Sequence, residues 1–232
     1  MSKISLKHSG GNVVSLNSPT SAPTSADVAF KLPNADGTSG QALVTDASGN
    51  LSFAGTGKIL QVVSTTYNTK ASVSVSNNYD NNSSYIYYIS GLDTTITTTA
   101  ANSKIIISGS VFGENTESDH VTGFVLSSSI GGTVAPIDAL RGVSDGSRGR
   151  LTSMMNTQYW NTNQDSTPST TSFTNFEYSP SQSSGTAIII KVGVVLLAGG
   201  SSTFYVNRTV TDNNSLNSEL GVSNITLMEV AA

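Results

Sequence analysis

The stretch AIIIKVGVVLL, residues 187–197, is the most apolar part of the chain. Its isoleucines and valines are β-branched, a glycine lies inside it and no capping residue precedes it, so the pattern favours a strand over a helix. The run KIIISGSVF, residues 104–112, follows a turn at AANS and predicts a second buried strand. These two runs indicate a core that is built from strands.

Weaker β patterns occur at residues 59–66, 72–76, 85–92, 94–99, 123–129, 133–137, 151–160, 203–210 and 224–230. The sequence SVSVS, residues 72–76, alternates strictly and so places Val73 and Val75 on one face. Gly131 and Gly132 predict a hairpin turn between the strands on either side. This series of strand patterns without a convincing helix predicts an all-β fold, with an antiparallel sandwich over residues 58–232.

Residues 1–57 carry a different pattern. Residues 1–25 combine an alternating stretch around Gly10 and Gly11 with NSPTSAPTS, which favours an extended linker or a disordered tail. Residues 26–57 contain LPNADGTSGQALVTDASGNLSF, residues 32–53, in which two turn motifs alternate with two short apolar runs. Runs this short bury too little apolar area to fold alone, so we expect each to pair with its copy in another chain.

The 232 residues carry few charges, because only 11% are Asp, Glu, Lys or Arg, against roughly 25% in an average soluble domain. Ser, Thr, Asn and Gly take their place, which suits a β-rich surface. A net charge of −4 with scattered Lys and Arg argues against nucleic acid as a partner. The absence of cysteine excludes disulfides and thiolate metal sites, so oligomerisation is the expected source of added stability.

The sequence shows no sign of export or membrane insertion. No run approaches the roughly 20 apolar residues of a membrane span, and the start, MSKISLKHSGG, lacks the apolar run of a signal peptide. The composition is nevertheless that of a surface adhesin. A virion protein combines these properties, because it is made in the host cytoplasm and released by lysis. We therefore expect the protein to be part of a virion.

Four stretches resemble one group of proteins. The sequence LPNADGTSGQALVTDASGNLSF resembles a connector in tail fibres and related virion appendages of tailed bacteriophages, especially phages of marine cyanobacteria. The phrases SGLDTTITTTAANSKIIISGSV (90–111), STFYVNRTVTDNN (202–214) and SNITLMEVAA (223–232) resemble phage distal domains with a jelly roll of the tumour necrosis factor and complement C1q type. The resemblance implies a homotrimer. Residues 1–25 would attach it to other virion proteins, residues 26–57 would form a short intertwined shaft, and residues 58–232 would form the tip.

Residues able to carry catalysis are sparse. The two histidines, His8 and His120, lie far apart, and no nucleophile-elbow motif occurs. Residues 114–120, ENTESDH, gather three carboxylates and an imidazole, which fits a divalent-metal site or, more commonly, a solvated loop. Glu177, Asp165 and Asp138 could cleave a glycan only if folding brought them together. We expect no enzyme activity, metal or cofactor.

The sequence offers three groups of candidate contacts for a bacterial surface glycan or protein: Tyr159 with Trp160 and Asn161, then Tyr79, then Arg148 with Arg150. The first group joins aromatics to an amide, which suits sugars, although large aromatics are usually buried. The second lies in NNYDNNSS, residues 77–84, a tip loop or a plain turn. The third, beside Arg141, is the one basic cluster and suits an anionic glycan or a mobile loop.

Together these features predict a structural protein of a phage virion, a trimeric tail fibre whose distal β domain contacts the host surface. Weak contacts would add up over three identical sites per trimer. Two alternatives stay open. One is a purely architectural capsid or tail decoration protein, whose loops are covered by its neighbours. The other is a glycan-degrading tip, whose carboxylates converge in a groove.

Overall fold

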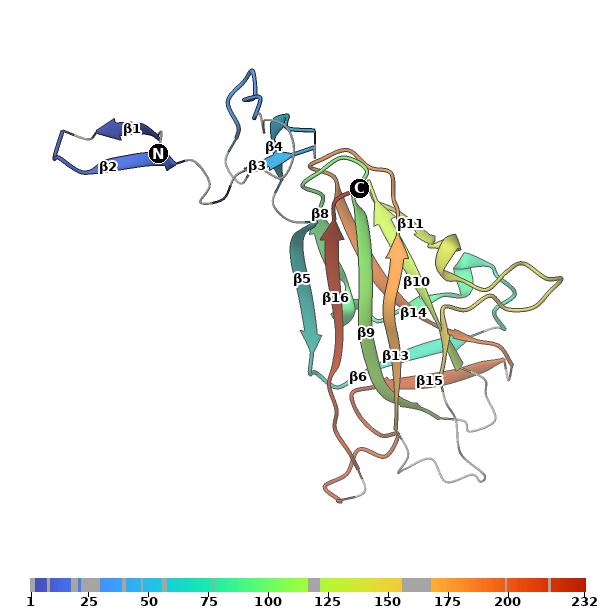
Figure 1. Cartoon of the computed structure of the whole chain (residues 1–232). Helices are drawn as coiled ribbons and strands as arrows, with labels where there is room; N and C mark the ends of the chain where they lie inside the picture. The colour runs from blue at the N-terminus through green and yellow to red at the C-terminus, as the bar shows by residue number, and fades with distance from the viewer. Residues whose placement is uncertain are drawn as a thin grey trace. The chain divides into compact units, whose positions relative to one another are not determined.

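The computed structural model describes residues 3–7, 9–17, 21, 30–38, 41–46, 48–55, 58–76, 78–116, 122–155, 168–198, 200–216 and 218–232. The chain divides into two compact units, Met1–Thr56 and Gly57–Ala232. Figure 1 labels most of their strands. The described part of both units is all-β apart from three short 3-10 turns. No helix in that part is long and apolar enough to cross a membrane.

The first unit holds two antiparallel hairpins. β1 (Lys3–Lys7) pairs with β2 (Val13–Asn17), and β3 (Gln41–Thr45) pairs with β4 (Leu51–Gly55). Within one chain, the two short apolar runs of this unit therefore pair with each other. The turn between them is the reason. Asp46 accepts hydrogen bonds from Ser48 N and from both nitrogens of Asn50, and Gly49 adopts a φ of +85°.

The described part of the second unit contains twelve strands. They are β5 (Ile59–Tyr67), β6 (Ala71–Ser76), β7 (Tyr87–Tyr88), β8 (Thr94–Thr97), β9 (Lys104–Asn115), β10 (Thr122–Ile130), β11 (Thr133–Pro136), β12 (Ser153–Met154), β13 (Ser169–Tyr178), β14 (Ala187–Leu196), β15 (Ser201–Val206) and β16 (Ser223–Val230). Short 3-10 turns lie at η1 (Ser83–Tyr85), η2 (Ser90–Leu92) and η3 (Asp138–Leu140). Gly131 and Gly132 form the predicted turn between β10 and β11, with φ values of +59° and +84°.

Eight of these strands form two antiparallel sheets. One sheet has the order β5–β16–β9–β13, and the other has the order β8–β14–β10–β11. Counted along the chain, these are the first, eighth, third and sixth strands, and the second, seventh, fourth and fifth. This is the strand order of a jelly roll, which confirms the predicted antiparallel jelly-roll sandwich.

The remaining strands extend the two sheets. The last residues of β9 pair with β15, which in turn pairs with β6, and β9 curves toward them in Figure 1. β7 pairs with β14, and β12 pairs with β10. The first and last strands lie side by side, and Ala231 N donates to Lys58 O at 2.6 Å. The chain therefore enters and leaves the second unit at one end of the sandwich.

The main core lies between the two sheets. β14 contributes Ile188, Ile190 and Val192, and β9 contributes Ile105 and Ile107, all of them fully buried. These residues occupy every second position of their strands, so the two runs that were predicted as buried strands face each other across the sandwich. The rings of Phe124 and Phe204 meet edge to face, with centroids 5.6 Å apart.

Two regions depart from the predicted strands. Residues 85–92 keep only the two-residue β7 between turns η1 and η2. Gly91 lies against the Tyr67 ring, where a Cβ would come within 2.4 Å, and this close packing accompanies the turn. The expected strand at 151–160 keeps only β12, and its residues beyond 155 lie outside the described part of the chain.

β13 is a strand that the sequence did not predict. Thr171 and Phe173 face the core from its first half. Asn175 then adopts a φ of +57° at a shift in register, after which Phe176 and Tyr178 also pack against the core. This bulge breaks the simple alternation of apolar residues that marks a strand in sequence.

A buried carboxylate ties β16 and β5 to the turn between β8 and β9. Glu229 is fully buried and accepts hydrogen bonds from Ser103 Oγ at 2.6 Å, Gln61 Nε2 at 2.6 Å, Thr99 N at 2.8 Å, Thr99 Oγ1 at 2.9 Å and Ala100 N at 3.2 Å. Burial by itself raises the pKa of this carboxyl. The hydrogen bonds from Ser103, Gln61 and Thr99 outweigh that effect and lower its pKa from 4.5 to about 2.

We expect Glu229 to make the fold sensitive to acid. Its folded pKa lies below its ordinary value, so its contribution is present above that ordinary value and is lost as pH falls toward about 2. The free energy of unfolding should decrease by on the order of 3 kcal/mol across this range. Urea denaturation at a series of pH values measures it. Glu229→Gln should lower stability at neutral pH and flatten this part of the profile, and an unchanged profile would contradict the assignment.

Candidate functional site

A second apolar layer covers the outer face of the β8–β14–β10–β11 sheet. Its buried residues are Tyr79, Ile86, Val125 and Val195, and Tyr85, Tyr88, Leu151 and Leu197 pack against them. Gly193 of β14 makes room for this layer, because a Cβ there would lie 2.1 Å from Ile86 Cγ2. The layer holds two predicted binding loops, around Tyr79 and around Arg148, against the sandwich.

Tyr79, a predicted receptor contact, lies inside this layer. It is 3% exposed, its backbone N donates to Leu196 O at 2.6 Å, and its hydroxyl accepts from Arg141 Nη1 at 2.8 Å. The aromatic ring gains more by packing against Val125 and Val195 than by standing in solvent. The prediction that Tyr79 lies on an exposed tip loop is therefore corrected, because its side chain packs between the loop and the sheet.

Asn81 joins the two predicted loops. Its Nδ2 donates to Arg148 O at 2.9 Å, and its Oδ1 accepts from Arg150 N at 2.8 Å. Asn81 has a φ of +74°, a conformation that asparagine tolerates better than most residues. The sequence treated these loops as separate candidates, and the structure brings them together. We call residues 78–84 and 141–151 the Asn81 junction.

Two arginines converge on one carboxylate beside the Asn81 junction. Arg150 Nη1 donates to Asp138 Oδ1 at 2.9 Å, Arg150 Nε donates to Gly142 O at 2.6 Å, and Arg141 Nη2 donates to the same carboxylate oxygen. The arginine side chains are 9% and 16% exposed, for Arg141 and Arg150 respectively. Hydrogen bonds from Arg141 and then Arg150 lower the pKa of Asp138. Arg150, which was predicted to contact the receptor, instead holds this loop in place through its bonds to Asp138 and Gly142.

Arg148 and Val143 lie on the exposed surface of the Asn81 junction. Val143 is 87% exposed, and the Arg148 side chain is 83% exposed while it pairs with Asp145 at 3.0 Å. An exposed ion pair of this kind contributes little to stability. Arg148 can therefore exchange Asp145 for an anionic group of a partner at small cost.

The other predicted contacts, Tyr159, Trp160 and Asn161, lie outside the described residues, as do Glu117, Asp119 and His120 of the metal hypothesis. Glu114 is described, and it is buried and accepts from Val210 N at 2.6 Å. Across the described part of the chain, no group of three or more His, Asp or Glu residues is placed to hold a metal ion.

The carboxylates considered for glycan cleavage do not converge where they are described. Glu177 pairs with Lys104 at 2.8 Å on the β5–β16–β9–β13 sheet. Asp138 lies in η3, which follows β11 of the opposite sheet, and Asp165 is outside the described residues. The structure therefore supplies no described pair for acid and base.

Sequence reasoning missed a polar hollow at the end of the sandwich that lies far from Lys58. It has a volume of about 390 Å³ and is lined by Lys70, Asp212, Asn213, Asn214, Ser215, Ser218 and Leu220. Lys70 Nζ donates to both oxygens of Asp212, at 2.8 and 2.9 Å, and the Arg208 guanidinium lies 4.0 Å from the centre of the Tyr205 ring. The sequence TDNNS resembles any polar turn, and Lys70 lies 142 residues away from Asp212, so no local signal could have identified this hollow.

Comparison with known proteins assigns no family. No family model matches the chain, and no curated protein matches it. Among solved structures it is similar to infectious bursal disease virus Gx strain, with 15% identity, a TM-score of 0.32 and coverage of 95% of this chain and 46% of that one. The structure of the Gt strain has 16% identity and a TM-score of 0.30, and the match covers 91% of this chain and 47% of that one. The crystal structure of the infectious bursal disease virus VP2 subviral particle has 13% identity and a TM-score of 0.29, and the match covers 94% of this chain and 50% of that one. The chain spans about half the length of these structures, and likenesses this weak assign it no function.

We expect Asn81→Ala to release the Asn81 junction. The change removes both hydrogen bonds that hold residues 148 and 150, which should cost roughly 1–3 kcal/mol of local stability. Trypsin cleaves after arginine, so limited proteolysis after Arg148 and Arg150 should become faster. Asn82→Ala is the matched control, because Asn82 Oδ1 accepts from Ser84 N within its own turn. Equal cleavage rates in the two variants would show that Asn81 does not hold the loop.

Proposed function

We propose that this protein is a non-enzymatic structural protein of a bacteriophage virion, a homotrimeric tail fibre or related appendage whose second unit forms the host-facing tip. The four stretches that resemble phage appendage proteins support the proposal, and so does the jelly-roll fold. The observation that carries it is the outer face of the β5–β16–β9–β13 sheet, which has the properties of a surface covered by another copy.

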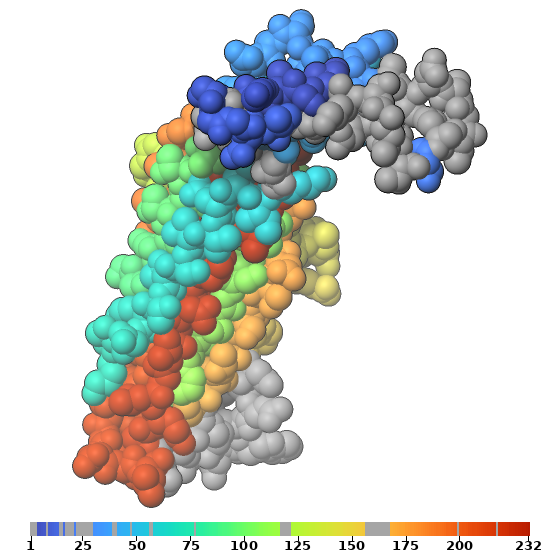
Figure 2. Space-filling model, turned by 60° about the vertical axis from the view of Figure 1, so that its left-hand side comes forward, coloured from blue at the N-terminus to red at the C-terminus, as the bar shows by residue number. Residues whose placement is uncertain are grey.

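This sheet face is apolar at one end and neutral along the rest. The strand register places Val62, Met228 and Ile106 in one row across β5, β16 and β9, and Val62 is 55% exposed. The charged residues on the described part of this face, Lys104 and Glu177, pair with each other. In Figure 2 the four strands lie side by side on the surface, with β5 in cyan, β16 in red, β9 in green and β13 in orange.

Several polar groups of this face already form hydrogen bonds across the strands. Ser64 Oγ and Thr226 Oγ1 lie 2.8 Å apart, Asn224 Nδ2 donates to Ser110 Oγ at 3.0 Å, and Asn175 N donates to Ser108 Oγ at 2.9 Å. Burying a polar group costs free energy mainly when its hydrogen bonds are lost. A second copy can therefore cover this face without leaving these hydroxyls and amides unpaired. Burial of the apolar row then supplies the favourable free energy of association.

Light scattering of the full chain tests the homotrimer directly. We expect three times the mass of one chain for the parent protein. Met228→Lys places a charge in the middle of the apolar row and should shift the protein toward monomers, because an unpaired buried charge is costly. Val134→Lys is the control, since Val134 is 40% exposed on β11 of the other sheet. A monomeric parent, or equal masses for both variants, would overturn the proposed interface.

We further propose that Tyr159, Trp160 and Asn161, together with Arg148, contact the bacterial surface. Trp160 is the only tryptophan of the chain, so its fluorescence reports directly on ligand contact. Fluorescently labelled protein should bind to cells in a panel of bacteria that includes marine cyanobacteria, and Trp160→Ala should weaken binding at least about tenfold for an aromatic anchor. Tyr85→Ala in the apolar layer serves as a comparison for loss of aromatic area alone. Absence of binding to every strain would favour the purely architectural role.

A further inference from the structure

The first unit has no core of its own among the side chains that the structure describes, because these are exposed or half-buried. Large apolar side chains stand in solvent there, and Leu32, Phe30, Leu43 and Phe53 are 78%, 65%, 49% and 38% exposed. An isolated two-stranded hairpin is marginally stable in water. These side chains therefore need a cover that one copy of the unit does not supply.

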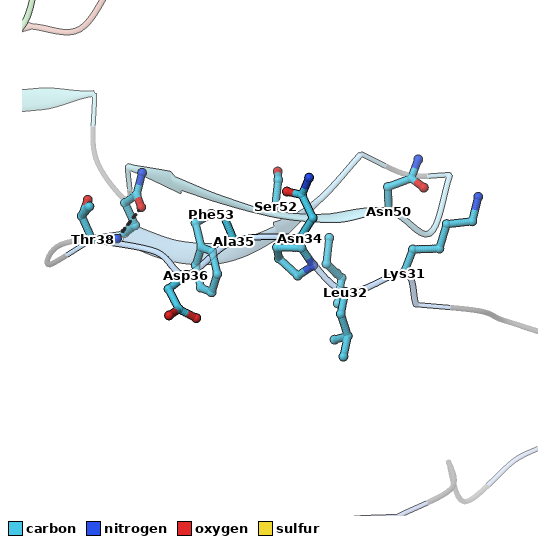
Figure 3. A pocket seen from close by; sticks show the side chains of 12 residues that line it. Lys31, Leu32, Asn34, Ala35, Asp36, Thr38, Asn50, Ser52 and Phe53 are labelled. Carbon is cyan, nitrogen blue, oxygen red and sulfur yellow. Dashed lines mark hydrogen bonds between the residues drawn. The ribbon is translucent and has the colours of Figure 1, made fainter.

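A hollow of about 590 Å³ lies between the β3–β4 hairpin and residues 31–38 (Figure 3). Its rim is held at both ends. Lys31 N donates to Gly49 O and Leu51 N donates to Lys31 O, both at 2.8 Å, while Thr38 N donates to Gln41 Oε1 at 2.8 Å. The rim and the hairpin therefore form one element, which we call the β3–β4 module, residues 30–38 and 41–55.

The β3–β4 module carries both a projection and a recess. Leu32 lies on the rim and points away from the hairpin strands, while Phe53 lies on the hairpin side of the hollow (Figure 3). Gly37 allows the rim to approach this ring, because a Cβ there would lie 2.6 Å from it. The module thus presents an exposed leucine beside a recess that contains the Phe53 ring among both polar and apolar side chains.

The hollow of the β3–β4 module also carries side chains of opposite charge. Lys31 and Asp36 both line the hollow and lie at its opposite ends (Figure 3). Neither forms an ion pair with another residue of the described chain. If Leu32 of one copy entered the hollow of the next, Lys31 would approach Asp36 of that copy. Apolar contact and charge then favour the same arrangement.

We infer that the β3–β4 module binds a second copy of itself, with Leu32 of one chain seated against Phe53 and Asp36 of the next. Because the projection and the recess are different parts of one surface, the contact is heterologous, and it forms a ring where the rotation between copies closes. This association is one of side chains between complete hairpins. It is a second interface, separate from the sheet face of the proposed trimer.

Disulfide trapping in the full chain tests this contact, because the protein contains no cysteine. Chains with Leu32→Cys and chains with Asp36→Cys, distinguished by tags of different length, are co-expressed, purified together and oxidised. The matched control pairs Leu32→Cys with Asp145→Cys, which replaces an exposed carboxylate of the second unit. Melting temperatures equal to that of the parent show that each variant is folded. We expect at least about tenfold more mixed cross-link than in the control, because a bound pair reacts at a high effective concentration.

The outcomes separate this contact from the proposed sheet interface. A trimeric mass with cross-linking no greater than in the control overturns the module contact and leaves the sheet interface standing. Strong cross-linking that persists in chains also carrying Met228→Lys supports a contact that is independent of the sheet face.

Discussion

The sandwich depends on the packing of β9 against β14, which brings two isoleucine-rich strands from opposite sheets into contact. β9 pairs with β16 on one side and β13 on the other, and β14 pairs with β10 and β8. Every strand of the jelly roll is therefore a direct neighbour of one of these two, except β5 and β11 at the edges. The apolar area that they bury stabilises both sheets at once. The packed sheets in turn fix the positions at which the loops begin and end.

The sequence was a good guide where one periodicity dominates. The isoleucines at alternating positions of β9 and β14 face the core, and the paired glycines 131 and 132 form the turn of a hairpin. β13 escaped notice because serine and threonine occur equally in loops and strands, and because its bulge at Asn175 shifts the apolar positions. Residue type alone could not distinguish a strand from a loop at these positions.

The candidate site was harder to predict because burial in a loop is decided by residues far away in the sequence. Tyr79 is buried by Val125 and Val195, which face outward from the second sheet and which sequence patterns place in an ordinary strand. The short runs 42–45 and 51–53 were predicted to pair with their copies in another chain, and within this chain they pair with each other across the Asp46 turn. Arg150 looked exposed, and its position beside Asp138 became visible only in three dimensions.

Because Ala231 bonds to Lys58, β5 and β16 bring the chain into and out of the jelly roll at the same end. The polar hollow around Asp212 and the loop before β16 lie at the other end, where no covalent link to the first unit passes. Loops there can lengthen, shorten or be exchanged during evolution without moving the point at which the sandwich is joined to the rest of the chain. The architecture thus separates the end at which the chain enters and leaves the sandwich from an end whose loops can vary without disturbing that attachment.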